Sequence, residues 1–374
     1  MIVSMAVGGS TNVLLHGPEI ARAAGFGNFA EDIMSFEEFN YLSEHVVPVL
    51  IDARPFGNYS MVDIDEKGGV QVIVKELLEA GLLNGDTLTC TGETLLQQVE
   101  RLNPEAPDTQ VIYTVEKPYK PTGGLRVLGG NLSPEFSAVL KLAGVEGGLE
   151  DNVFKGKARV FNSESDLLQT LENQPGVFEN NDMVIVRYEG PSGAPGMPEM
   201  LDSTSRITTL CREKGIVVGL MTDARFSGGS VGLVIGHVGP EAALGGPLAL
   251  VEDGDEVVVD LNTNELNCTE LSYPQKLKIR KNSWEKVVED NGGTHPSIGI
   301  VDSRLLNRMR RTAVSAVFGA GMHPDRVLWV KNLRESVKTD FVPTNKYRAG
   351  SGNCLLYTSP SPRDLSTSRM PSSA

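Results

Sequence analysis

The sequence predicts an α/β protein in which the trailing part of an α/β domain is followed by a barrel-like β/α domain. Before about residue 115, apolar residues recur mostly at helical spacing. After residue 116, many short β-rich runs alternate with Gly, Asp and Asn turns, and few helices intervene. A Pro-rich stretch at 103–124 separates the two patterns. The expected domains are therefore 1–115 and 116–335, with 336–353 left unassigned.

The elements of the first domain follow from local patterns. A helix is expected at 13–24, with Pro18 near its start, where a missing N–H group costs little. Helices are also expected at 70–83, which stops at an Asn-Gly pair, and at 93–102. The apolar run 46–53 is expected to form a strand.

From residue 111 onward, short β-branched runs between turn residues predict a series of strands. The sequence Asp253-Gly254-Asp255 is interpreted as a hairpin turn. The expected strands are 111–115, 125–128, 158–161, 183–188, 216–221, 231–235, 248–251 and 257–261, and the expected helices are 163–171, 204–214, 273–286 and 304–318.

The composition is that of an acidic globular protein of 374 residues, with a formal net charge of −14. Such a charge argues against non-specific binding to nucleic acid or to a membrane surface. No apolar run approaches the roughly 20 residues that span a bilayer, and no secretion signal is visible at the start. The few cysteines lack any C-x-x-C or cluster spacing and suit a reducing compartment. The compartment itself stays open between bacterial cytoplasm and a eukaryotic mitochondrion or plastid.

The most informative stretch is 221–240, which reads MTDARFSGGSVGLVIGHVGP. It places Ser227 on a turn formed with Gly228 and Gly229, directly after a short apolar run. Because glycine has no Cβ, backbone N–H groups at such a turn can approach a bound anion. An isolated Ser-Gly-Gly is more often a tight turn, so the neighbouring sequence has to decide the interpretation.

Five separated sequence blocks decide how the Ser-Gly-Gly turn is interpreted. They are AVGGSTN at 6–12, KPTGG at 120–124 with GNL at 130–132, RYEGP at 187–191 with PGMPEM at 195–200, TDARFSGG at 222–229, and 236–246. In this order they resemble the blocks of the dihydroxy-acid and sugar-acid dehydratase family. The resemblance implies removal of water from a 2,3-dihydroxy carboxylate to give a 2-oxo acid. It also implies an iron–sulfur cluster, a magnesium ion, a small hydroxy-acid substrate, a homodimer and a β/α swivelling domain.

The resemblance also assigns roles to residues of the turn. Ser227 takes the part of the base that removes the C2 proton, although a free serine is too weak a base without nearby positive charge. Gly228 and Gly229 are expected to donate backbone N–H groups to the substrate carboxylate. Ser10 and Thr11 either line the substrate site or cap the helix that follows them.

Glu199 is the expected magnesium ligand, because hard cations prefer carboxylate oxygens. Glu189 is the competing carboxylate and is ranked lower, since a carboxylate directly after a strand often accepts backbone hydrogen bonds. His237 is expected to be structural, and Arg225 is left open between a local carboxylate and the substrate.

The ends of the chain carry two further expectations. The family's cluster cysteines lie upstream of the block at 6–12, so the chain is expected to be the C-terminal portion of a longer protein. The cluster ligands would then lie outside it, and the chain alone would be inactive. Residues 354–374, CLLYTSPSPRDLSTSRMPSSA, resemble translated sequencing-adapter sequence and are expected to be an artefact.

Alternatives remain in the sequence. Ala224 and the long C-terminal extension lean toward a sugar-acid dehydratase, whereas the runs VPVLID at 47–52 and YSMVD at 59–63 lean toward a dihydroxy-acid dehydratase of branched-chain amino-acid biosynthesis. A serine hydrolase is disfavoured because Arg225 stands where a G-x-S-x-G elbow needs glycine. A binding or assembly module made of the β-rich domain is the non-enzymatic alternative.

Overall fold

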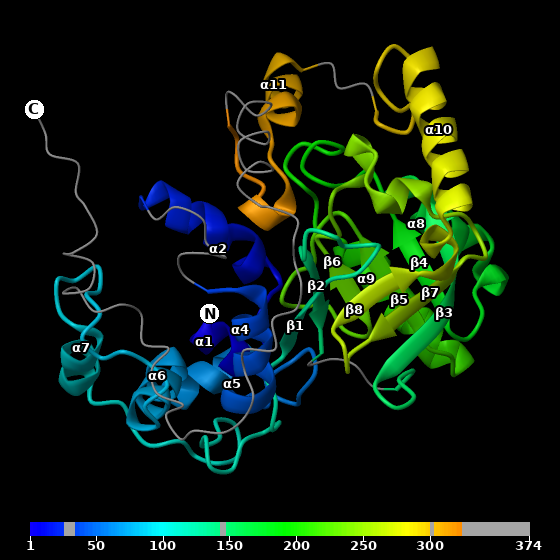
Figure 1. The fold of residues 1–374 in the computed structure, drawn as a ribbon. Helices are drawn as coiled ribbons and strands as arrows, with labels where there is room; N and C mark the ends of the chain where they lie inside the picture. Colours follow the sequence, from blue (N-terminus) through cyan, green and yellow to red (C-terminus); the bar gives the residue numbers. More distant parts are fainter. Residues whose placement is uncertain (26–33, 143–146, 300–302, 324–374) are drawn as a thin grey trace, which may run out of the picture.

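The computed structural model describes residues 1–25, 34–142, 147–299 and 303–323. Figure 1 shows two neighbouring parts, one made of the N-terminal helices and one built around a curved β-sheet. The segments 336–353, left unassigned, and 354–374, expected to be an artefact, lie outside the described residues. None of the helices described is long and apolar enough to cross a bilayer.

The N-terminal part consists of short helices packed around a common apolar core. Its buried residues include Phe39, Leu50 and Ile73, together with Val127 and Val139 from the sheet of the other part. The helices are α1 (Ile2–Ala6), α2 (Asn12–Ala23), α4 (Phe36–Tyr41) continuing as the π-helix η1 (Leu42–Val46), α5 (Met61–Glu66), α6 (Gly69–Glu79) and α7 (Leu95–Leu102).

The strands expected at 46–53 and 111–115 form only isolated bridges. Val49 pairs with Lys120, whereas Ile51 pairs with Ile112, so residues two apart bond to two different segments. A continuous ladder needs one partner strand, and these residues do not have one. The described residues of this part therefore contain bridges in place of a regular sheet.

The second part is a mixed sheet of eight strands, in the order β1-β2-β6-β5-β4-β3-β7-β8. The central pairs β3–β4, β4–β5 and β5–β6 are parallel, and the outer pairs are antiparallel. The strands are β1 (Leu125–Leu128), β2 (Ala138–Lys141), β3 (Val153–Phe161), β4 (Asp182–Val186), β5 (Val218–Thr222), β6 (Val234–Gly236), β7 (Glu256–Asp260) and β8 (Glu265–Cys268).

The two edges of this sheet come together, which makes it a nearly closed barrel. Gly129, just after β1, donates its N–H to Asn264 and accepts from Leu266 of β8. These bonds connect the first and last strands in the sheet order, so the barrel-like prediction is confirmed. The structure does not test whether the N-terminal helices are the trailing part of a larger sheet-containing domain.

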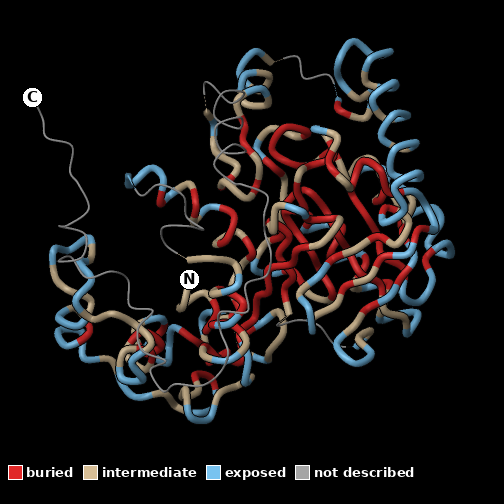
Figure 2. The backbone as a smooth tube through the Cα atoms, in the orientation of Figure 1, coloured by how far each residue is buried: buried red, intermediate tan, exposed pale blue. Residues whose placement is uncertain are grey.

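Alternation along the strands divides the apolar residues between the inside and the outside of the barrel. Met183 and Ile185 of β4 point into the interior cluster, while Val184 and Val186 belong to the cluster beneath α8 (Glu164–Asn173) and α9 (Leu201–Lys214). In Figure 2 the buried residues concentrate in the strands, whereas α10 (Pro274–Asp290) is mostly exposed. The outer face of β1 and β2 packs against the N-terminal core.

Further expected elements differ from the structure. Of the strand expected at 248–251, residues 248–250 lie in the 3-10 helix η4 (Pro247–Leu250), which starts at a proline that lacks the N–H a strand would need. The helix expected at 304–318 ends earlier, as α11 (Arg304–Thr312) followed by η6 (Ala316–Phe318). The turn at 253–255 is not a hairpin turn, because β7 pairs with β3 and β8 and the hairpin loop falls at 261–264. The remaining 3-10 turns are η2 (Pro175–Val177), η3 (Ala242–Leu244) and η5 (Thr269–Ser272).

Helix α10 is attached to the barrel by a buried ion pair. The guanidinium of Arg280 contacts both carboxylate oxygens of Asp255, with an Nη2–Oδ1 distance of 2.9 Å. Asp255 is 5% exposed, and its carboxylate also accepts a hydrogen bond from the N–H of Glu252. Removing one partner of such a pair leaves a buried charge without its counter-charge.

We therefore expect Arg280→Met to lower the free energy of unfolding by about 3 kcal/mol, the typical cost of breaking a buried pair. Arg206→Met is the matched control, because Arg206 pairs with Asp202 on the surface of α9 and should cost less than about 0.5 kcal/mol. Urea unfolding of both variants checks this. Equal, small losses would show that the Arg280 pair does not hold α10.

Candidate functional site

The segment after β5 is held by a buried carboxylate. Asp223 is 1% exposed and accepts hydrogen bonds from the backbone N–H groups of Tyr188, Glu189 and Ala242. Burial, with the nearby Glu241 carboxylate, raises the pKa of Asp223 to about 7, and the three N–H donors act in the opposite direction. Asp223 thus joins the ends of β4 and β5 to the start of η3 and fixes the path of the chain toward Ser227.

The carbonyl oxygen of Phe226, the residue before Ser227, is held by the N-terminal part. The hydroxyl of Ser10 donates to it at 3.1 Å and the hydroxyl of Thr11 at 3.3 Å. The Nε2 atom of His237 lies 3.3 Å from the Thr11 hydroxyl. Because that hydroxyl proton is directed at Phe226, Nε2 of His237 acts as the donor. His237 is therefore buried and hydrogen-bonded to Thr11, and its structural role stays a prediction.

Ser10 makes two hydrogen bonds, one at the start of α2 and one to the segment before Ser227. Its Oγ accepts from the N–H of Asn12 at the start of α2 and donates to Phe226. It therefore belongs to the helix terminus and also lies beside the serine turn. Whether Ser10 and Thr11 contact a substrate stays a prediction.

Ser227 is half-buried, and Gly228 and Gly229 are exposed. The N–H of Gly229 donates to Oγ of Ser227 at 3.2 Å, so this donor serves the serine in the structure as it stands. A Cβ on Gly228 would come no closer than 3.9 Å to the Cβ of Ser10, so bulk at Gly228 is not excluded by packing.

The buried ammonium of Lys141, at the end of β2, donates to the carbonyl oxygen of Gly228. Burial lowers the pKa of Lys141 to about 8. The sequence analysis missed this residue. The available signal was a lysine inside the apolar run AVLKLAG at 138–144, one strand away from the glycine turn.

Glu199 approaches the turn from the loop before α9, where it forms a bridge with Arg225. Its Oε1 accepts from Nδ2 of Asn12 at 2.6 Å. The Oδ1 atom of Asn12 is buried and has no hydrogen-bond partner among the described residues. A half-buried carboxylate beside an unsatisfied amide oxygen is a donor set that suits a hard divalent cation. That Glu199 is a magnesium ligand therefore stays a prediction, and its surroundings fit it.

The two other charged residues near the turn serve the backbone. Glu189 accepts from the N–H of Glu164 at 3.0 Å, and burial raises its pKa. Arg225 donates to the carbonyl of Met197 at 2.6 Å, and its Nη1 lies 3.4 Å from Nε2 of His16. The contacts that the structure gives Arg225 are thus to a carbonyl and a histidine.

Two cavities flank the loop that carries Glu199. The larger, of about 550 Å³, lies between the end of β4 and α11, and its lining includes Glu189 and Arg310. The smaller, of about 170 Å³, has Arg225 and His16 in an otherwise apolar lining. This second cavity lies on the side where α2 meets the Ser227 segment.

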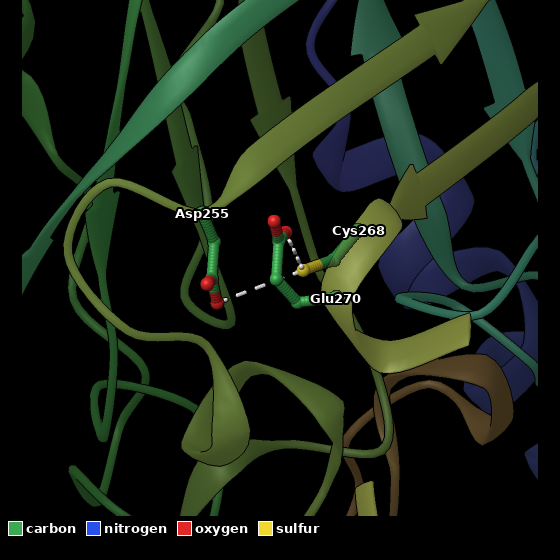
Figure 3. A group of neighbouring side chains, drawn as sticks. All are labelled: Asp255, Cys268 and Glu270. Carbon is green, nitrogen blue, oxygen red and sulfur yellow. Dashed lines mark hydrogen bonds between the residues drawn. The ribbon is translucent and has the colours of Figure 1, made fainter. Parts of the chain in front are cut away.

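A different group of potential metal ligands lies where β7 begins and β8 ends. Figure 3 shows Cys268, whose Sγ is 3.7 Å from an oxygen of Asp255 and 3.7 Å from an oxygen of Glu270. Burial raises the pKa of the Cys268 thiol to about 12, and Asp255 is engaged by Arg280. A metal-binding cysteine has to be a thiolate, so this group suits a protonated thiol better than a metal.

The cysteines of the described residues do not form a cluster site. Cys90 is exposed, Cys211 is half-buried, and Cys268 belongs to the group just described, which contains one cysteine only. Iron–sulfur clusters need several thiolates at one place. The cysteines in the part of the chain that the structure describes therefore do not fit a cluster.

Comparison with known sequences identifies the family. The family model of the dihydroxy-acid/6-phosphogluconate dehydratase C-terminal domain matches residues 110–320, and the N-terminal model matches residues 1–98. This chain belongs to that family. The match to the N-terminal model corrects the expectation that the chain holds the C-terminal portion only, because sequence of both family domains is present.

Individual relatives of the dehydratase family support the same assignment. A dihydroxy-acid dehydratase of Arthrobacter sp. (strain FB24) is 44% identical over 283 residues, covering 76% of this chain and 46% of the relative. One from Saccharolobus islandicus (strain M.14.25 / Kamchatka #1) is 44% identical over 75% of this chain and 47% of its own length. Dihydroxy-acid dehydratase 2 of Corynebacterium efficiens is 46% identical over 71% of this chain and 44% of the relative. The chain thus spans about half the length of the curated relatives it matches.

The buried His237 makes the site sensitive to acid. Burial, with smaller effects of His16 and Arg225, lowers the pKa of His237 to about 3. Between pH 6.5 and 3 the unfolded chain therefore binds a proton that the folded chain does not, and stability falls as the pH falls. Over two pH units of this window, the free energy of unfolding falls by about 3 kcal/mol.

We expect His237→Gln to remove this part of the acid sensitivity, because the amide keeps a donor toward Thr11 without titrating. The free energy of unfolding of the two proteins, measured between pH 7 and 4.5, should diverge by up to about 3 kcal/mol in favour of the variant. His45→Gln, at an exposed position, is the control. Parallel curves for the original protein and His237→Gln would refute a buried neutral imidazole.

Proposed function

We propose that the whole protein is a hydro-lyase that removes water from 2,3-dihydroxy carboxylic acids, most specifically a dihydroxy-acid dehydratase of branched-chain amino-acid biosynthesis. The observation that carries the proposal is the turn of Ser227, which projects from the barrel and is held by hydroxyls of the N-terminal part. The names of the relatives support the substrate class. The predicted homodimer rests on the resemblance alone.

In the proposed reaction, Oγ of Ser227 accepts the proton from C2 of the substrate. The C2–H electrons form the C2=C3 double bond as the C3 hydroxyl leaves as water after protonation. The resulting enol tautomerises to the 2-oxo acid. Exposed backbone at Gly228 and Gly229 would receive the substrate carboxylate, with the Gly229 N–H shared between Oγ of Ser227 and the ligand.

The proposed reaction involves two cofactors, a magnesium ion and an iron–sulfur cluster. A magnesium ion held by Glu199 would supply positive charge to the substrate oxygens, and Asn12 orients this carboxylate through its amide N–H. An iron–sulfur cluster is proposed with ligands outside the described residues, and no step of the reaction is assigned to it.

One of the two features behind the sugar-acid alternative, beside the long C-terminal extension, is Ala224, which is buried away from the turn surface. Ala224 is fully buried in the cluster beneath α9, with Phe226 as a neighbour in the same cluster. A buried methyl group there does not face a substrate. Position 224 therefore gives no reason to prefer an aldonate, and the branched-chain substrate stays the main proposal.

The serine-hydrolase alternative lacks a Ser–His pair in the described residues. Oγ of Ser227 accepts from Gly229, and Nε2 of His237 is directed at Thr11. A hydrolase nucleophile needs a base within hydrogen-bond reach. The geometry supports proton abstraction by a serine whose basicity is raised by surrounding positive charge.

We expect Ser227→Ala in the whole protein to reduce turnover of 2,3-dihydroxy-3-methylbutanoate by a factor of at least about 100, the usual contribution of a general base. Ser205→Ala, on the exposed face of α9, is the matched control and should leave turnover unchanged. Assays with 2,3-dihydroxy-3-methylbutanoate and with a pentonate separate the two substrate classes. Full turnover by Ser227→Ala would end the proposal, and preference for the pentonate would replace the substrate.

A further inference from the structure

Lys141 is a buried cation directly beneath the serine turn. Its residue exposure is 0%, and it is the last residue of β2, next to β6 in the sheet. Alternation along β2 directs Leu140 into the barrel and Lys141 to the outer face. There its ammonium donates to the carbonyl oxygen of Gly228.

Among the described residues, no carboxylate lies within ion-pair distance of this ammonium. Taking an unpaired ammonium out of water is costly, and a neutral amide donor would make the same bond to a carbonyl. The burial that lowers its pKa to about 8 leaves most of the group charged at neutral pH. Holding the loop in place therefore does not by itself account for a lysine here.

The bond from Lys141 leads to Ser227 through a single peptide group. The carbonyl of Gly228 accepts from Lys141, and the N–H of the same peptide, on Gly229, donates to Oγ of Ser227 at 3.2 Å. A donor at the oxygen of a peptide polarises the group and strengthens its N–H as a donor. A stronger donor at Oγ favours the negatively charged form of the hydroxyl.

The other charged or titratable groups near the turn are differently engaged. Arg225 donates to the carbonyl of Met197 and faces His16, whose pKa is lowered mainly by burial. Glu199 is bound by Asn12, and His237 is directed at Thr11. Of these groups, Lys141 is the one with a continuous hydrogen-bonded connection to Oγ of Ser227.

We propose that Lys141 is a positioning residue that acts on Ser227 through the Gly228–Gly229 peptide and favours the ionised hydroxyl. It holds the carbonyl end of this peptide, and its charge raises the donor strength of the N–H end. The inference rests on the proposed role of Ser227 as a base, and it adds a source of positive charge within the chain itself.

The first test is the pH dependence of Ser227 labelling by phenylmethanesulfonyl fluoride, followed by mass spectrometry of the peptide that contains Ser227. In this reaction Oγ attacks the sulfonyl sulfur, fluoride leaves, and the hydroxyl proton goes to solvent. Lys141→Gln keeps a neutral donor and Lys141→Met removes the donor. Lys157→Gln, at an exposed lysine of β3 in the same sheet, is the matched control.

We expect labelling at pH 7.5 to fall at least about tenfold in both Lys141 variants, as one pKa unit of the hydroxyl would produce, and to be unchanged in Lys157→Gln. If the bond only positions the loop, Lys141→Gln will label as the original protein does, and the inference is overturned. Absence of Ser227 labelling in the original protein across pH 6–9 would overturn it as well.

A second measurement is independent of Ser227 chemistry. In glycine-labelled protein, the amide resonance of Gly229 should shift with a midpoint near pH 8, the pKa of Lys141, and this shift should vanish in Lys141→Met. If the Gly229 amide resonance shifted in the same way in Lys141→Met, the connection from Lys141 to Gly229 would be refuted. If Ser227→Ala retained turnover while both Lys141 effects persisted, the proposed function would fail and the connection would stand.

Discussion

The carbonyl oxygen of Phe226 accepts hydrogen bonds from two hydroxyl groups of the N-terminal part, and the position of Ser227 depends on this contact. A barrel alone would leave the segment after β5 as an exposed loop with glycines at its tip. Ser10 and Thr11 fix one end of that loop from outside the barrel. His237, returning from β6, completes the arrangement by bonding to Thr11. The site is therefore a shared product of both family domains.

The barrel contributes the charges around this contact. Because side chains alternate along the strands, the outer face of β1 and β2 serves as packing surface for the N-terminal core. The same alternation places Lys141 on that face, beneath the turn. Asp223 anchors the approach to the turn from the opposite side, through three backbone N–H groups. A buried cation and a buried acid thus constrain a segment whose tip is exposed.

The sequence predicted helices and strands well where local residue patterns determine them. The helix expected at 204–214 is α9, with an earlier start, and the strand expected at 125–128 is β1. The strand expected at 183–188 ends at Val186, because Asp223 binds the N–H of Tyr188 and the φ of Tyr188 is +70°. The run at 46–53 failed as a strand because its partners lie in two segments, which no local pattern reveals.

The residues of the candidate site could largely be predicted from the sequence, but the hydrogen bonds between them could not. The blocks carrying Ser10, Glu199 and Ser227 were recognised from the sequence, and the structure brings all three to one region. The bond from Asn12 to Glu199 and the position of Lys141 depend on contacts between residues 87 or more apart in the chain. Such contacts are fixed by the closing of the barrel and by the docking of the N-terminal helices.

Backbone amide exchange at the turn tests the central claim most directly. The original protein is compared with a Ser10→Ala/Thr11→Val double variant, in which Phe226 loses both hydroxyl donors. We expect the amides of Ser230 and His237, both hydrogen-bonded around the turn, to exchange at least about tenfold faster in the variant. The amide of Leu220 in β5 should be unaffected. Unchanged exchange at Ser230 and His237 would show that the N-terminal part does not hold the serine turn.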